Sequence, residues 1–159
     1  MSTALILSGG GARAAYQVGV LRGVMEIHGR DQLPFDVICG TSAGAINAVF
    51  MAANAHRPRE GVERLYRAWR GISAGDVYDH GWAVVLGNLW RIARSPFSRD
   101  GRAAPEALLD NAPLRQMLRN WLDFDAAQRN LAEGLLRTLC ITAMEYGSGS
   151  SVAFFDGGD

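Results

Sequence analysis

The chain has 159 residues, of which 48% are hydrophobic and 20% charged. This composition indicates one globular domain with its own core and excludes a disordered chain. Sixteen basic residues balance sixteen acidic ones, so the charge gives no argument for a nucleic-acid partner. Every basic residue is arginine, which excludes a lysine-dependent phosphate loop or Schiff base and fits a GC-rich bacterial genome.

The sequence contains no recognisable signal peptide, and no apolar stretch reaches the ~18 residues that a membrane span needs. We therefore expect a cytoplasmic protein, with peripheral membrane contact as an option. Cys39 and Cys140 both lie in apolar runs. They are expected to be small buried side chains rather than a disulfide or a metal pair, and no metal or organic cofactor is expected.

Residues 3–55 follow a strand–helix–strand–helix order, which is typical of a parallel sheet covered by helices. The predicted strands are 3–7 and 35–39, and the predicted helices are 12–28 and about 42–55. The first helix is indicated by apolar residues at spacings of four and three, with a glycine as its C-cap: Tyr16, Val20, Val24, Ile27 and Gly29.

The remainder of the chain alternates between helical, loop and strand patterns. The expected elements are helices at 58–69, 112–122 and 126–133, then strands at 135–144 and 151–155 joined by a turn at 146–149.

An apolar segment at 81–97 contains Trp82 and Trp90 and carries Arg91 and Arg94 near its end. Such a segment suits a lid or a peripheral contact with a membrane. The alternative is a core helix, which is favoured because the apolar residues lie on most sides rather than in one stripe.

The most informative motif is Gly40-Thr41-Ser42-Ala43-Gly44, which has the form G-x-S-x-G and joins a predicted strand to a predicted helix. A serine in such a sharp turn has its Oγ exposed, and the flanking glycines let strand and helix pack closely. The following helix N-terminus favours negative charge that develops nearby. This chemistry is that of a serine nucleophile in acyl transfer, although the motif also occurs by chance as a small-residue turn.

A second glycine-rich segment, Ser8-Gly-Gly-Gly-Ala-Arg-Ala14, follows the first strand, and three interpretations compete for it. A dinucleotide-binding loop is disfavoured, because Ala14 replaces the third glycine and the ribose-binding acid is missing. A purely structural turn is the second. The third is an oxyanion hole, in which the N–H groups of Gly9 to Gly11 would converge on a developing negative oxygen. Adjacent parallel strands would bring this loop beside Ser42.

With these motifs the chain resembles the start of a patatin-like phospholipase domain. The likeness rests on residues 7–21 and 40–48 and is specific over residues 3–55. It implies a hydrolase of lipid esters or phospholipids that uses a serine–aspartate dyad. Carried over by residue, Ser42 is the nucleophile, Gly9, Gly10 and Gly11 form the oxyanion hole, and Arg13 fills a basic position that contacts substrate.

The base is the open question of this site. His28, His56 and His80 do not lie at strand ends, and the resemblance implies an aspartate in an Asp-Gly-Gly motif instead. Asp156-Gly157-Gly158 matches that motif literally. In the family, however, a helix and a further strand separate such a strand pair from the catalytic aspartate, so Asp156 is more simply a turn residue that does not hydrogen-bond Ser42.

The expectation is thus an α/β domain over residues 1–159 with a mainly parallel sheet, helices on both faces, and a truncation before its final strands. Its predicted function is that of a serine acyl hydrolase of lipid esters. The alternatives are a catalytically silent fragment that binds only lipid or a protein partner, and a disfavoured nucleotide-binding module.

Overall fold

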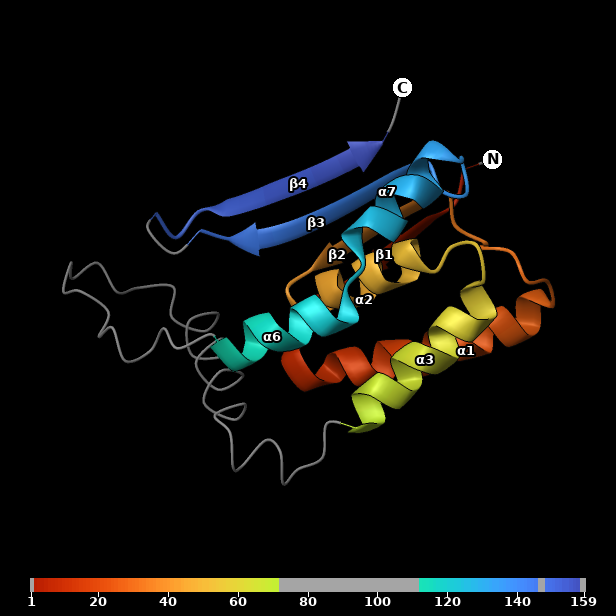
Figure 1. The fold of residues 1–159 in the computed structure, drawn as a ribbon, viewed down its shortest axis with the longest axis horizontal. Coiled ribbons are helices and arrows are strands. Elements are labelled where there is room, and N and C mark those ends of the chain that lie inside the picture. Colours follow the sequence, from red (N-terminus) through yellow and green to blue (C-terminus); the bar gives the residue numbers. More distant parts are fainter. Residues whose placement is uncertain (1, 72–111, 146–147, 158–159) are drawn as a thin grey trace.

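The computed structural model describes residues 2–71, 112–145 and 148–157, and in them strands and helices follow one another in the order that the sequence predicts (Figure 1). Observed boundaries fall within about three residues of the predicted ones, and the second and last strands each extend two residues further than expected. The elements, in chain order, are β1 (Ala4–Leu7), the 3₁₀ turn η1 (Gly11–Arg13), α1 (Ala14–His28), β2 (Val37–Thr41), α2 (Ala43–Ala53), α3 (Pro58–Gly71), α6 (Ala112–Trp121), α7 (Phe124–Ala132), β3 (Thr138–Met144) and β4 (Ser151–Gly157).

The four strands form one sheet in the order β1-β2-β3-β4. β1, β2 and β3 are parallel, and β4 returns antiparallel beside β3. In the register, Leu7 lies beside Gly40, and Gly40 lies beside Ile141. The segments that follow β1 and β2 therefore emerge at the same edge of the sheet, which is where the sequence analysis placed the two glycine motifs.

The described helices cover one face of this sheet. α2 packs against β1, β2 and β3, while α7 packs on α2 and reaches β4 (Figure 1). α1 and α3 pack on each other and both touch α2. The expected α/β class with a mainly parallel sheet is confirmed. The prediction of helices on both faces also concerns residues 72–111, which lie outside the described part of the chain. Connections between parallel strands are right-handed, so successive strands added in one direction place their crossover helices on the same side.

The opposite face of the sheet is apolar and open in the part of the chain that is described. Ile6 is 78% exposed and Phe155 is 77% exposed, whereas Leu7 and Ile38 on the covered face are buried. Cys39 and Cys140 are register neighbours on this open face and are only half-buried. The expectation that both cysteines are buried is therefore wrong, because no described helix covers their side of the sheet.

The helix α1 is apolar on two sides. The apolar residues from which the helix was predicted lie on the side that faces solvent. Tyr16, Val20 and Ile27 are exposed. The face that packs into the core consists of Ala14, Val18, Leu21 and Met25. Both sets recur at helical spacing, so periodicity correctly predicts the helix without identifying its buried face. The predicted C-cap is correct, since Gly29 has φ 74° and its N–H bonds the carbonyl of Met25.

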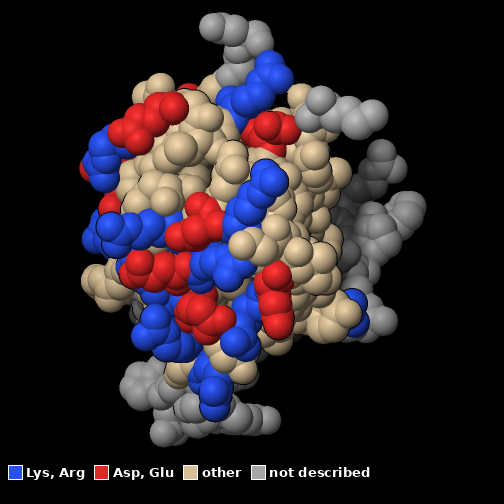
Figure 2. All heavy atoms as spheres, turned by 90° about the vertical axis from the view of Figure 1, so that its right-hand side faces the viewer, with Lys and Arg blue, Asp and Glu red and all other residues tan. Residues whose placement is uncertain are grey.

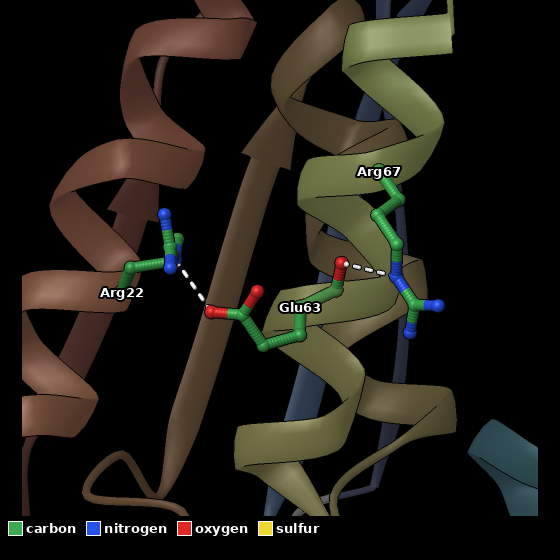
Figure 3. Close-up of polar contacts among 3 residues, drawn as sticks. All are labelled: Arg22, Glu63 and Arg67. Carbon is green, nitrogen blue, oxygen red and sulfur yellow. Dashed lines mark hydrogen bonds and ion pairs between the residues drawn. The ribbon is translucent and has the colours of Figure 1, made fainter.

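Charged side chains link the outer surfaces of α1 and α3. Arg22 Nε lies 2.5 Å from Glu63 Oε1, and Arg67 Nε donates to the Glu63 carbonyl (Figure 3). Both partners of the ion pair are about half exposed, so it contributes at most about 1 kcal/mol. Figure 2 shows arginine and acidic side chains interspersed over the face where the parallel strands begin, and neither charge forms a large patch there.

The apolar segment 81–97 lies outside the described residues. Of the helices that are described, none combines the length and the apolar character needed to cross a bilayer.

A buried asparagine joins α7 to the end of α2. Asn130 is 4% exposed, and its Nδ2 donates to the carbonyls of Ala52 and Ala53 at 2.7 and 3.0 Å. The last carbonyls of a helix have no partner within the helix. The Ala52 carbonyl also accepts the N–H of Ala55, so the Ala53 carbonyl is the group that depends on this side chain for its hydrogen bond.

Replacing Asn130 with alanine is expected to lower the free energy of unfolding by about 1–3 kcal/mol, because it leaves a buried carbonyl unsatisfied. Urea unfolding followed by circular dichroism measures this change. Gln128→Ala, at an exposed position of the same helix, is the control and should change stability by less than about 0.5 kcal/mol. Equal effects of the two substitutions would contradict the assigned role.

Candidate active site

Ser42 occupies the junction between β2 and α2 in a strained conformation. Its φ of 54° and ψ of −121° make it the one non-glycine residue with positive φ in the described parts of the chain. The side chain is exposed, and no side chain or backbone group among the described residues hydrogen-bonds its Oγ. The backbone N–H is used by the sheet, since it donates to the Thr142 carbonyl at 3.2 Å. The serine therefore has the sharp, exposed turn that the motif predicts.

The two glycines of the motif are required by close backbone contacts. A Cβ on Gly40 would lie 2.5 Å from the Gly44 carbonyl oxygen and 2.6 Å from the Cα of Ala45. A Cβ on Gly44 would overlap the carbonyl oxygen of Leu7 and lie 2.6 Å from that of Ser8. The first turn of α2 thus rests directly on the ends of β1 and β2, and no larger residue fits at either position.

The glycine-rich loop lies beside Ser42. A Cβ built on Gly9 would stand 3.4 Å from the Cβ of Ser42. Gly11 has φ 57°, a left-handed conformation that favours glycine. The first backbone hydrogen bond within the loop runs from the Arg13 N–H to the Gly10 carbonyl. The N–H groups of Gly9 to Ala12 have no acceptor among the described residues. These donors are free next to the serine.

Arg13 lies at the end of η1 and is exposed. Its aliphatic carbons approach within 3.3–3.8 Å of the position that a Cβ on Gly10 would take. The side chain thus packs along the loop, and its guanidinium makes no ion pair among the described residues.

The structure does not bring Asp156 to Ser42. Asp156 lies within β4 rather than in a following loop, and it pairs with Leu139. Leu139 in turn pairs with Ile38, four residues before Ser42. With strands about 4.8 Å apart and a rise of about 3.3 Å per residue, two strand spacings and four residues place Asp156 roughly 16 Å from the serine. Its Oδ1 instead accepts the N–H of Gly157 at 2.9 Å.

The described histidines are equally remote from the serine. His28 ends α1 and His56 follows α2, so both lie near the edge of the sheet where the parallel strands begin. His80 lies outside the described residues.

Two polar residues near the site were given no role in the sequence analysis. Gln17 is half-buried on α1, and Asn47 is fully buried on α2. Asn47 was detectable as the only strongly polar side chain in an otherwise apolar helix, from Ala43 to Ala53. A buried amide needs partners, and those of Asn47 lead to the glycine loop.

Cys39 is a poor alternative nucleophile. Burial raises the pKa of the Cys39 thiol, and the adjacent Cys140 thiol adds to the rise. A raised pKa lowers the fraction of reactive thiolate, so Cys39 is suited to packing rather than to catalysis.

The fold and this turn define a class: an α/β protein with a strained serine between a parallel strand and a helix, beside a glycine loop with free N–H groups. The family model for patatin-like phospholipase matches residues 5–155, nearly the whole chain. The chain belongs to the patatin-like phospholipase family.

One curated relative is lysophospholipase nte1 of Aspergillus terreus (strain NIH 2624 / FGSC A1156), which is 37% identical over 75 residues. That alignment covers 43% of this chain and 5% of the relative. A solved structure, the ExoU–SpcU complex from the type III secretion system of Pseudomonas aeruginosa, aligns with 23% identity and a TM-score of 0.45. It covers 96% of this chain and 32% of the matched one. The chain therefore spans only a small part of the proteins it matches.

Gly44→Ala is expected to prevent stable folding or to lower the unfolding free energy by several kcal/mol, because the new Cβ overlaps the carbonyls that end β1. The matched control is Gly19→Ala on α1, where a Cβ would meet no atom within 4 Å. That change should stabilise by about 0.5–1 kcal/mol, since alanine is the better helix former. Thermal unfolding compares the two, and a Gly44→Ala protein as stable as the control would refute the close packing.

Ser42→Gly is expected to be more stable than Ser42→Ala, although alanine usually stabilises a helix end. A non-glycine residue in such a conformation costs about 1–3 kcal/mol, and glycine removes that cost. The comparison is made by chemical unfolding of both variants. An alanine variant that equals or exceeds the glycine variant in stability would mean that the turn is not strained.

Proposed function

We propose that this chain carries the nucleophile and the oxyanion loop of a serine acyl hydrolase that acts on lipid esters, phospholipids included. The observation that carries the proposal is that a loop of unpaired N–H groups lies next to Ser42. A Cβ built on Gly9 in this loop would lie 3.4 Å from the Cβ of Ser42. Membership of the patatin-like phospholipase family supports the lipid ester as the substrate class.

The proposed chemistry begins at Ser42. An aspartate carboxylate takes the Oγ proton, and Oγ attacks the ester carbonyl carbon, whose oxygen becomes negative. The N–H groups of Gly9, Gly10 and Gly11 stabilise that oxygen, and each such donor is typically worth about a hundred- to a thousand-fold in rate. The ester C–O bond then breaks and the alcohol leaves with the proton. Water, deprotonated by the same carboxylate, hydrolyses the acyl-serine and restores the enzyme.

Two further contributions are local to the site. α2 begins at Ala43, and the N–H groups of Ala43 and Gly44 have no acceptor among the described residues, whereas those of Ala45 and Ile46 donate to the Ser42 carbonyl. The positive dipole end of the helix points toward the serine. Arg13, exposed and packed along the loop, is proposed to attract the anionic head group of a phospholipid. Residues 81–97 are proposed as a peripheral membrane contact on their composition alone.

The base of this proposal is an aspartate other than Asp156. A general base must come within about 2.6–3.2 Å of the group whose proton it takes, or act through one water. The register separates Asp156 from the serine by far more than that.

A fluorophosphonate probe, followed by mass spectrometry of the intact protein, tests the nucleophile. We expect one covalent adduct on Ser42 and none on Ser42→Ala. Ser151→Ala, at an exposed serine on β4, is the matched control and should be labelled like the unmodified chain. Asp156→Asn should also leave labelling unchanged.

The other outcomes are distinct. A folded chain without an adduct would favour the alternative of a catalytically silent domain that only binds lipid or a protein partner, and phospholipid vesicles would then detect binding. Loss of labelling in a folded Asp156→Asn variant would identify Asp156 as the base and overturn the separation argued above.

A further inference from the structure

A chain of hydrogen bonds connects α3 to the residue that precedes the glycine loop. Trp69 Nε1 donates to Asn47 Oδ1 at 2.8 Å. Asn47 Nδ2 donates to the Ala14 carbonyl at 3.0 Å and to Gln17 Oε1 at 3.1 Å. Gln17 Nε2 donates to the Ser8 carbonyl at 2.8 Å. The path crosses three helices and ends at the backbone of the loop.

The orientation of every amide in this chain follows from its first member. An indole N–H is a donor only, so it must face the oxygen of Asn47. The Asn47 nitrogen then faces Gln17, which must present its oxygen there. Consequently the Gln17 nitrogen is left to face Ser8, where a carbonyl accepts it. The direction of donation is therefore set from Trp69 to Ser8 without ambiguity.

Two members of this hydrogen-bond chain, Gln17 and Asn47, bind the carbonyls at the two ends of the glycine loop. Ser8 immediately precedes Gly9, and Ala14 immediately follows η1. The Ser8 carbonyl also faces Gly44, where the first turn of α2 packs. Between Ser8 and Ala14 the loop has few backbone bonds of its own, and three consecutive glycines leave it with little intrinsic stiffness.

We propose that Gln17 and Asn47 are positioning residues, which hold the N–H groups of Gly9 to Ala12 in place beside Ser42. This inference rests on the proposed function, because the loop's donors matter only if an oxygen becomes negative beside the serine. Preorganised donors are effective because they need no rearrangement during the reaction. Asn47 is 0% exposed and sets the geometry, while Gln17 transmits it to the loop.

The test uses Gln17, whose half-buried position tolerates substitution better than that of Asn47. Gln17→Met keeps the length of the side chain and removes its bonds to Ser8 and to Asn47. In ¹⁵N relaxation, the amide order parameters of Gly9 to Gly11 should fall from about 0.85 in the unmodified chain to below about 0.6. The maximal rate of Ser42 labelling by the fluorophosphonate should fall roughly ten- to a hundred-fold, because a displacement of about 1 Å can cost that much.

The probe concentration at half-maximal rate should remain unchanged, since the loop's donors act on the transition state rather than on probe binding. Gln128→Met on α7 is the matched control and should alter neither quantity. Trp69→Phe removes the indole donor that orients Asn47. It should loosen the loop and slow labelling in the same direction as Gln17→Met.

Unchanged order parameters in a folded Gln17→Met variant would overturn the positioning role. A mobile loop with an unchanged labelling rate would overturn its consequence for catalysis. If the unmodified chain is not labelled at all, the proposed function fails. The relaxation comparison then still decides whether Gln17 holds the loop, so the two failures are separable.

Discussion

The architecture depends on how closely α2 approaches the carboxyl ends of β1 and β2. At Gly44 the helix backbone touches the carbonyls of Leu7 and Ser8, and at Gly40 the strand backbone touches the helix in return. Interiors are packed to near-crystal density, so a contact this close determines what can lie around it. The chain must turn sharply between the two glycines, which leaves Ser42 projecting outward. The loop that follows β1 is forced against the same turn, because its first residues share that contact.

The features that the sequence predicts well are those set by neighbours along the chain. The strand–helix order, the cap at Gly29 and the turn at Ser42 each follow from local residue types and spacing. The packing face of α1 does not, because Tyr16, Val20 and Ile27 have the same periodicity as the residues that are buried. Nor does the placement of the described helices on one face of the sheet, which is a consequence of crossover handedness and strand order rather than of any one segment.

The burial of α2 follows from its central place among the described helices. It packs against all three parallel strands, while α1, α3 and α7 pack around it. An apolar helix can be buried on all sides at little cost, because its backbone groups are hydrogen-bonded within the helix. The two exceptions are the polar side chain of Asn47 and the terminal carbonyl of Ala53. Asn47 is satisfied by its own bonds to Ala14, Gln17 and Trp69, and the Ala53 carbonyl accepts a bond from Asn130.

Ser42 and the glycine loop are held by different means, which accounts for where the polar side chains lie. The strained conformation of Ser42 is anchored by backbone bonds on both sides. Its N–H donates to Thr142 in the sheet, and its carbonyl accepts the N–H of Ala45 in α2. A few kcal/mol of strain can persist there because sheet and helix over-determine the turn. The proposed donors for an oxyanion cannot be held in that way, since a backbone N–H that is bonded within the protein is no longer free for a substrate. A loop that must remain both unpaired and ordered has to be fixed through its carbonyls and its ends, and the Ser8 and Ala14 carbonyls are where Gln17 and Asn47 bind.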